Sequence, residues 1–401
     1  MNEHLKIRTI DGVLSYPVHH MRGGTSTGVI FNEAYVPKEL ALREELLRHI
    51  FGVPLNGVID KNSQTTGLGR GYPTSNKAFL VSIDRDKGKV SSTLAQLAAT
   101  KSDIDWSVNC GNMSSAIPLW LSEIGWFDQK TGNLEVDIFN TNTGVTTLAR
   151  MHKDSGGKFS CSEIPGVAGQ FPSVDLFLNE PVGSKTGRLL PTGSAVNIIQ
   201  GKTVSCVDVA VPMVICEASE FGMTGDESPS ELSGNKKLMD DLREVWISAG
   251  LLMGLKKRDG APMTREDLAR SETIPKICLV SPARGSGKLS VRYFTPQQCH
   301  QSLAVSGGCC LAAASLLPGT VANKCAENLQ ALTGDWSEIE MAIENPAGLL
   351  EMTIKARSVS DGVLVSRAGY RRNAQLLVEG YMSLYGASDQ LRDALIEMSA
   401  S

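Results

Sequence analysis

A pattern that recurs halfway along the chain constrains the fold of this sequence more than any other feature. The segment 77–82 (KAFLVS) resembles 276–281 (KICLVS), which lies 199 positions later. The same shift relates Cys110 to Cys309, and each cysteine lies beside a glycine in a run of small residues. A nearly constant shift over separate segments indicates a duplicated structural unit. We therefore expect two similar halves.

The predicted halves comprise residues 1–184 and 185–401. They meet at 185–193, a stretch marked by glycine and proline, where chain turns are common. We expect each half to form a domain, because 401 residues exceed what one hydrophobic core usually supports. The tail from residue 370 onward is expected to pack back on the first domain. A cleft between two similar domains is a natural place for a small-ligand site.

Short β-like runs between glycine-rich turns outnumber the helical patterns and do not alternate regularly with them. This arrangement predicts an α+β fold rather than a doubly wound α/β sheet. Strands are expected at 77–83, 134–139, 204–209, 277–280, 289–294 and 339–343. Helices are expected at 38–51 and 238–255, where apolar residues recur at helical spacing, and at 374–382 and 389–398.

The composition disfavours several classes of function. The net charge is −4, so the chain offers no excess of positive charge to a nucleic-acid backbone. Nine cysteines and six histidines are dispersed without the spacing of a metal site, so no metal is expected. Neither a signal peptide nor an apolar run of the ~20 residues that span a membrane is found. We therefore expect a cytoplasmic protein with reduced thiols and no membrane or nucleic-acid partner.

Cys110 is the first candidate for chemistry. It follows a short β-like run and precedes 113–121, a predicted buried helix that Pro118 should kink or shorten. A cysteine at a helix N-terminus lies near free backbone N–H groups and positive partial charge, which favour the thiolate. Such a thiol can exchange a proton with carbon. The alternative is an inert buried cysteine, which is the commoner setting for this residue type.

Lys77 is the second candidate. A glycine-rich loop, 67–76, leads to it, and an apolar strand follows it. A lysine at that junction could point into a cleft, where burial or a neighbouring cation favours the neutral amine that acts as a base. The alternative is a solvated lysine at the end of a strand.

The segment 21–28 (MRGGTSTG) is a candidate anion site, because closely spaced glycines and hydroxyls expose backbone N–H groups. It lacks the GK[ST] ending of a P-loop, so a carboxylate is as good a guest as a phosphate. Arg22 could pair with a carboxylate through two hydrogen bonds, while Thr25 and Ser26 form the anion-binding turn. The alternative is a plain turn between two strands, with Arg22 facing solvent.

Two other glycine-rich segments are weaker candidates. The run 67–71 is too short for a dinucleotide fingerprint and lacks the βα pattern that follows one. The run 284–288 (RGSGK) looks suited to phosphate, but it lies between two strand-like runs and is more simply a hairpin turn. His300 could be a catalytic acid or base, although such a histidine is more often structural.

Taken together, these stretches resemble the PrpF family of isomerases over nearly the whole chain. The matching motifs are MRGGTSTG (21–28), GLGRGYPTSNK (67–77), NCGNMSSA (109–116), TGRLLPTG (186–193), VDVAVPMV (207–214), the stretch 300–314, and AGYRRNAQLLVEG (368–380). The resemblance implies a diaminopimelate-epimerase-like fold. In that fold each of two similar domains is a curved β-sheet or barrel around a central helix, with the active site in the cleft between them.

The resemblance also implies an activity. Members of the family isomerise 2-methylaconitate, methylitaconate, aconitate or oxalomesaconate without a cofactor, and their catalytic lysine and cysteine fall on Lys77 and Cys110. We expect proton transfer on a small unsaturated di- or tricarboxylate, with cis–trans isomerisation of 2-methylaconitate first. Tautomerisation of 4-oxalomesaconate and double-bond isomerisation of aconitate or methylitaconate are alternatives. An amino-acid racemase and a non-catalytic carboxylate-binding protein are further alternatives, and a homo-oligomer is left open.

The expected substrate-binding residues lie within these motifs. They are Arg22, Thr25, Ser26, Ser75, Asn109 and Asn112 in the first half, with Ser306 and Gly307 in the second. His300 and Cys309 are secondary candidates. An epimerase-type alignment of the glycines places the second catalytic cysteine of that fold at Val305 instead of Cys309.

Two positions depart from the usual family pattern. Thr27 stands where the family usually has the lysine of GGTSKG, and Asn76 stands where it usually has serine. If the family lysine holds a carboxylate, the substrate or its pose differs here. Both changes leave Lys77 and Cys110 intact.

Overall fold

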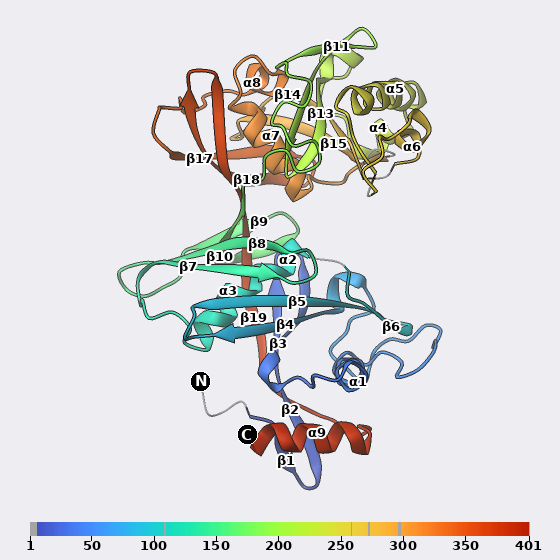
Figure 1. The fold of residues 1–401 in the computed structure, drawn as a ribbon, viewed down its shortest axis with the longest axis vertical. Helices are drawn as coiled ribbons and strands as arrows, with labels where there is room; N and C mark the ends of the chain where they lie inside the picture. The colour runs from blue at the N-terminus through green and yellow to red at the C-terminus, as the bar shows by residue number, and fades with distance from the viewer. Residues whose placement is uncertain (1–5, 108–109, 258, 272, 296–297, 401) are drawn as a thin grey trace. The chain divides into compact units, whose positions relative to one another are not determined.

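The computed structural model describes residues 6–107, 110–257, 259–271, 273–295 and 298–400. The chain forms two compact units (Figure 1). The first comprises Met1–Leu176 together with Arg372–Ser401, and the second comprises Phe177–Arg371. The C-terminal segment therefore belongs to the first unit by its contacts.

The first unit is mainly β-strand. Its strands are β1 (Arg8–Ile10), β2 (Val13–Gly23), β3 (Ser26–Asn32), β4 (Lys77–Asp84), β5 (Lys89–Ala98), β6 (Lys101–Asp105), β7 (Gly132–Asn140), β8 (Val145–Lys153) and β9 (Cys161–Ile164). Its helices are α1 (Leu40–Phe51), α2 (Gly111–Ser114), α3 (Ala116–Glu123) and α9 (Asp389–Ala400), with 3₁₀ turns at Glu33–Tyr35 and Pro73–Ser75. The strands β10 (Val167–Asn179) and β19 (Gly362–Ser383) each contain a boundary between the units.

The second unit has a comparable set of strands and more helix. Its strands are β11 (Asn197–Ile199), β12 (Lys202–Val209), β13 (Val211–Glu217), β14 (Lys276–Pro282), β15 (Leu289–Thr295), β16 (Gln298–Cys299), β17 (Ser337–Asn345) and β18 (Gly348–Val359). Its helices are α4 (Pro229–Gly234), α5 (Lys236–Leu252), α6 (Arg265–Arg270), α7 (Val305–Ser315) and α8 (Val321–Cys325), with a 3₁₀ turn at Ala218–Phe221.

The two units share one order of strand pairing. In the first, β2–β3 is antiparallel, β3–β4 parallel, β4–β5 antiparallel, β5–β7 parallel and β7–β8 antiparallel. In the second, β12–β13, β13–β14, β14–β15, β15–β17 and β17–β18 repeat these senses in the same order. The two segments whose likeness suggested a repeat, β4 and β14, occupy the same place in this order. The predicted α+β class and the similarity of the two units are confirmed.

Side chains alternate along each strand, so the sheet of the first unit has two faces that can bury apolar side chains. Helices pack on both of these faces. One face packs against α1 and α9 in a core of fully or nearly fully buried side chains, among them Val29, Phe31, Ala78, Leu80, Leu46, Ile50, Leu391 and Leu395. Helices α2 and α3 pack on β2, and the His19 ring of β2 lies 5.9 Å from the ring of Trp120 on α3. One face of β2 and β3 therefore belongs to the core with α1 and α9, and the opposite face contacts α2.

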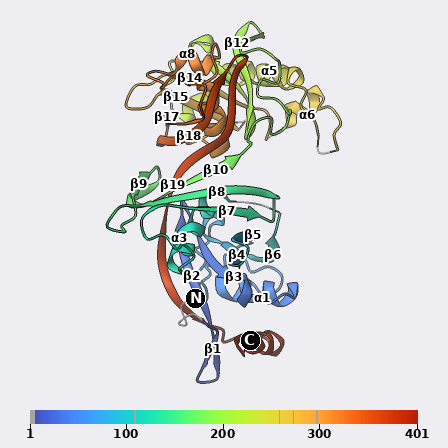
Figure 2. The ribbon, with the colours of Figure 1, turned by 60° about the vertical axis from the view of Figure 1, so that its left-hand side comes forward.

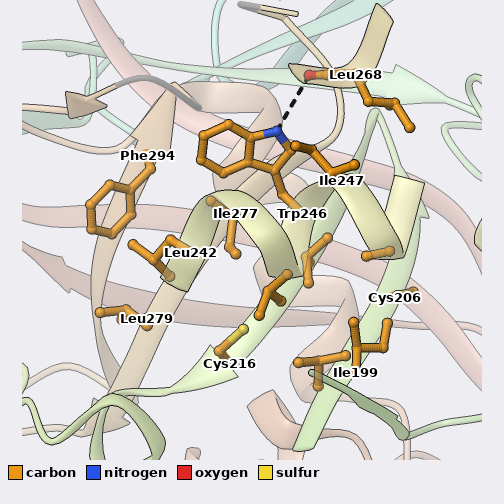
Figure 3. Close-up of a cluster of buried hydrophobic side chains, with 14 of the residues drawn as sticks. Ile199, Cys206, Cys216, Leu242, Trp246, Ile247, Leu268, Ile277, Leu279 and Phe294 are labelled. Carbon is orange, nitrogen blue, oxygen red and sulfur yellow. Dashed lines mark hydrogen bonds between the residues drawn. The ribbon is translucent and has the colours of Figure 1, made fainter. Parts of the chain in front are cut away.

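Helix α7 occupies the corresponding place in the second unit. It packs on β12, β13, β17 and β18, and every residue from Gly307 to Ser315 is buried. A helix that is apolar and buried on all sides is a core helix. A separate core lies under α5, where Trp246 donates to the carbonyl oxygen of Leu268 at 3.4 Å (Figure 3).

Four of the five predicted helices are confirmed, 38–51 as α1, 113–121 as α2 and α3, 238–255 as α5 and 389–398 as α9, and each predicted strand is present. The helix predicted at 374–382 is wrong, because this segment belongs to β19 and pairs antiparallel with β2 (Figure 2). Ala374 lies opposite Gly23, and Met382 lies opposite Tyr16. Pairing with β2 overrides a weak helical preference, which Gly380 lowers further while Val378 and Tyr381 favour a strand.

Candidate active site

The hairpin between β2 and β3 forms one wall of the site. Gly23 pairs with Ser26, so Gly24 and Thr25 make a two-residue turn, and Gly24 has a φ of +53°. This turn lies against the start of α2. A Cβ on Gly23 would lie 2.6 Å from the backbone oxygen of Asn112, and one on Gly24 would lie 2.5 Å from its Oδ1. Both glycines are needed for this close approach, and Gly24 also for its backbone conformation.

Cys110 lies at the N-cap of α2, facing this hairpin. Its Sγ accepts a hydrogen bond from the Met113 N–H at 3.5 Å and lies 3.8 Å from the Oγ of Ser26. The helical segment is split at Ser115, between α2 and α3. Pro118 lies in the first turn of α3, where it has no N–H to donate to the carbonyl of Ser114, so it shortens the helix as expected.

Lys77 is the first residue of β4. It pairs with Gly28 of β3 on one side and with Gln96 of β5 on the other. A Cβ on Gly28 would lie only 2.2 Å from the Lys77 backbone oxygen, so β3 and β4 approach too closely here for a side chain. The Nζ of Lys77 donates to the Oε1 of Gln96.

The strand register puts Lys77 and Cys110 on the same face of the sheet. Ser26 and Gly28 share one face of β3, because they are two residues apart. Lys77 pairs with Gly28 and so points the same way, and Cys110 contacts Ser26 on that face. From a strand rise of ~3.3 Å and a spacing of ~4.8 Å, the Cα atoms of Ser26 and Lys77 are about 8 Å apart. The amine of Lys77 and the thiol of Cys110 therefore belong to one face of the sheet.

Asn112 connects the hairpin to the C-terminal strand. Its Nδ2 donates to the Oγ1 of Thr25 at 3.1 Å, and its Oδ1 accepts from the Nε of Arg372 at 2.9 Å. Arg372, on β19, is only 9% exposed. This guanidinium group was missed in the sequence, although it lies within the 368–380 motif. Asn109, the other predicted asparagine, lies outside the described residues.

Arg22 braces the hairpin from the opposite face. Its Nη1 donates to the carbonyl oxygen of Gly24 at 2.9 Å and to the Oδ1 of Asn373 at 2.7 Å. The guanidinium group also stacks on the Phe171 ring at 4.5 Å. Burial lowers the pKa of Arg22. Within the described part of the chain its buried Nη2 has no hydrogen bond, so two-point recognition of a carboxylate stays a prediction.

Ser75 and Asn76 are held by the loop before Lys77. The Ser75 Oγ donates to the carbonyl oxygen of Tyr72 at 2.9 Å. Asn76 exchanges two hydrogen bonds with Gln64, at 2.7 and 3.1 Å, and its side chain is therefore part of the loop's own structure. Thr27 pairs with Arg22, so by alternation it points away from the face of Ser26 and Cys110. Neither departure from the family pattern changes the face that carries Lys77 and Cys110.

The remaining predicted residues lie in the second unit, at and before α7. Ser306 and Gly307 are in the first turn of the helix, and a Cβ on Gly307 would lie 2.5 Å from the Tyr293 ring. Cys309 is fully buried inside α7, whereas the N-cap position that Cys110 holds in α2 belongs here to Ala304. The Nδ1 of His300 accepts from the N–H of Ser302 at 2.9 Å, and the ring contacts Tyr293 edge-on. Roles in binding or catalysis for these four residues stay predictions.

The glycine-rich run 284–288 is a hairpin turn between β14 and β15, as expected. Its backbone N–H groups are already occupied. The Glu344 carboxylate accepts from the N–H groups of Arg284, Gly285 and Gly287 at 2.9, 2.7 and 3.0 Å. Burial raises the pKa of Glu344, but the three N–H donors together outweigh it and the pKa is lowered. An acidic side chain thus fills the place where a phosphate would bind.

Two other kinds of site are absent from the described ranges. No group of three or more His, Cys, Asp or Glu side chains there could hold a metal ion. No helix of that part of the chain is long and apolar enough to cross a membrane.

Comparison with known proteins gives one consistent result. The family described as "PrpF protein" matches residues 13–385. YbhH of Escherichia coli (strain K12) is 32% identical over 342 residues, which are 84% of this chain and 90% of that protein. The 4-oxalomesaconate tautomerase of Pseudomonas putida is 29% identical over 375 residues, 93% of this chain and 97% of that protein. The crystal structure of a methylitaconate-delta-isomerase matches with a TM-score of 0.76 and 25% identity, covering 94% of this chain and 96% of that one.

Proposed function

Because the chain belongs to the PrpF family and is an isomerase, we propose that it moves a proton, and with it a double bond, on a small unsaturated tricarboxylic acid. One observation carries the proposal. Lys77 and Cys110 lie on the same face of one sheet, since Lys77 pairs with Gly28 and Cys110 contacts Ser26, two residues before Gly28. An amine and a thiol so arranged can serve two carbons of one substrate.

The proposed reaction begins with Lys77 as base. Its neutral amine removes a proton from a carbon next to the double bond, and the electron pair spreads into the adjacent carboxylate. For a shift of the double bond, the Cys110 thiol then gives its proton to another carbon. For cis–trans isomerisation, the former double bond rotates while the electron pair is delocalised, and the thiol gives its proton to the carbon that lost one. The proton on Lys77 returns to the Cys110 sulfur, directly or through solvent, and both groups regain their starting states.

The substrate's carboxylates are proposed to dock at the hairpin and at the start of α2. Thr25 and Asn112 are joined at 3.1 Å, and Arg372 donates to Asn112 at 2.9 Å, so polar hydrogens and one guanidinium group gather here. Hydrogen bonds aimed at a carboxylate stabilise the negative charge that develops when the proton leaves.

We propose 2-methylaconitate as the first substrate, with cis–trans isomerisation. The second candidate is 4-oxalomesaconate, which the similarity to the Pseudomonas putida tautomerase over 93% of the chain favours. A panel of these acids and methylitaconate, followed by ultraviolet absorbance, distinguishes them. The acid that is turned over with the highest kcat/KM identifies the reaction.

Solvent deuterium exchange tests the base directly. Lys77→Ala is expected to abolish deuterium incorporation into the substrate, because no other amine is proposed to reach the reacting carbon. Lys89→Ala, which removes an exposed lysine from β5, serves as the matched control and should exchange at the wild-type rate. Retained exchange in Lys77→Ala would refute this role. A lack of exchange with every acid in the wild-type protein would favour a carboxylate-binding protein.

A further inference from the structure

The side chain of Gln96, on β5, has an unusual set of partners beside Lys77. Its Nε2, which carries two hydrogens, lies within hydrogen-bond distance of three backbone carbonyl oxygens, those of Pro73 at 3.0 Å, Asn76 at 2.9 Å and Leu97 at 3.0 Å. A carboxamide donates only through its nitrogen, so these contacts fix which end of the group faces the loop. The Oε1 is therefore turned toward Lys77, whose Nζ donates to it.

The carbonyl groups that orient Gln96 are themselves held in place. Gln64 and Asn76 are each only 1% exposed and exchange two hydrogen bonds through their side-chain amides. The Gln64 Nε2 also donates to the carbonyl oxygen of Phe51 at 3.0 Å, at the end of α1. The loop before β4 is thus anchored to a helix, and the orientation of Gln96 follows from that anchor.

We propose that Gln96 is the positioning residue for Lys77. This inference rests on the proposed function, because Gln96 acts only through the lysine base. A neutral amide oxygen directs the amine by one hydrogen bond. It adds no negative charge, which would hold a proton on the amine and oppose its action as a base. A glutamate at this position would orient the lysine equally well but would keep it protonated.

Comparison of the two repeated halves indicates that a glutamine accompanies the lysine in the first unit only. The same shift of 199 positions relates Lys77 to Lys276 and Gln96 to Thr295. In the second unit Ile277 pairs with Phe294 in an antiparallel pair of strands. Continuing this register by one residue places Thr295 opposite Lys276. The carboxamide therefore accompanies the lysine that is proposed to act as base, while the repeated lysine has a threonine in that place.

Two substitutions test the proposal through the pH dependence of the reaction. Gln96→Met removes the acceptor oxygen and both N–H donors, and kcat should fall about tenfold to a hundredfold with KM changed by less than about threefold. Gln96→Glu should move the rising limb of the pH–kcat profile upward by about one pH unit. Gln200→Met is the matched control, because it makes the same replacement at an exposed glutamine of the second unit, whose Nε2 donates to the Oγ of Ser248. It should keep the wild-type kcat and the wild-type profile.

A readout without substrate separates this proposal from the proposed function. Acetic anhydride acetylates only neutral amines, and peptide mass spectrometry reports the extent at Lys77 as a function of pH. The labelling midpoint should rise in Gln96→Glu and fall in Gln96→Met. If both variants lose Tm while the midpoint and the pH–kcat profile stay at wild-type positions, Gln96 only braces the loop and the proposal is overturned. Failure of the proposed function gives a different result, since Lys77→Ala would then retain exchange while the midpoint still responds to Gln96.

Discussion

Gly28→Ala is the substitution that most directly tests the geometry of the site. The added Cβ would lie 2.2 Å from the backbone oxygen of Lys77 and 3.1 Å from its Cβ. A carbon and an oxygen in contact are ordinarily about 3.3 Å apart, so β3 and β4 must separate locally by about 1 Å. The atom in the way belongs to the backbone, so a change of rotamer cannot relieve the clash.

Two effects of known size follow from that displacement. Forcing one extra methyl group into a packed site costs about 1–3 kcal/mol of unfolding free energy. A displacement of about 1 Å at a catalytic group costs about a hundredfold in rate. We therefore expect Gly28→Ala to lower the Tm by several degrees and kcat by about a hundredfold, since the moved residue is Lys77 itself.

The matched control is Gly380→Ala. Gly380 also lies in a strand of the first unit, and a Cβ there would meet nothing within 4 Å. This variant should keep wild-type activity and equal or slightly higher stability, because alanine has less conformational freedom than glycine in the unfolded chain. Thermal unfolding and solvent deuterium exchange measure both variants. Wild-type Tm together with wild-type exchange in Gly28→Ala would show that the strands do not approach as described.

Two further predictions concern other residues of the first unit. Cys110→Ser should lower product formation at least about a hundredfold, because a hydroxyl is a much weaker acid than a thiol. Deuterium exchange that depends on Lys77 should persist in this variant. Loss of exchange as well would assign the first proton transfer to the cysteine. Burial, with a smaller contribution from the positive charge of Arg70, lowers the pKa of His20 from 6.5 to about 4. The unfolded chain therefore binds a proton between these values that the folded protein does not, so stability should fall as the pH drops from 6.5 to about 4, by at most about 1.4 kcal/mol per pH unit. Urea titrations should show a smaller decrease in His20→Gln, where His19, whose pKa burial also lowers, still contributes, and identical pH dependence in both proteins would contradict the assignment.

The sequence predicted the parts of the site that depend on local pattern. The loop followed by an apolar strand located Lys77 at the start of β4, and the run of small residues located Cys110 at the N-cap of α2. Both predictions depended only on the residues adjacent to Lys77 and Cys110 in the sequence.

Features that depend on distant residues were not accessible in this way. Gln96 lies beside Lys77 because β4 and β5 pair, and Arg372 reaches Asn112 across 260 positions of sequence. The helix predicted at 374–382 is wrong for the same reason, since its partner strand, β2, lies near the other end of the chain. The shift that relates Cys110 to Cys309 in sequence fails in structure, because α7 begins several residues before that cysteine.

The pairing of β2 with β19 has a consequence for how the protein is made. Strand β2 carries Arg22 and leads into the hairpin. One of its two edges is paired by residues 374–383 of β19. A ribosome that has finished the first 176 residues has therefore produced a sheet with an exposed edge, which can pair with other nascent chains. The whole second unit is synthesised before the missing strand emerges. The unit that begins first thus completes its fold last, and Arg372 joins Asn112 only at that final stage.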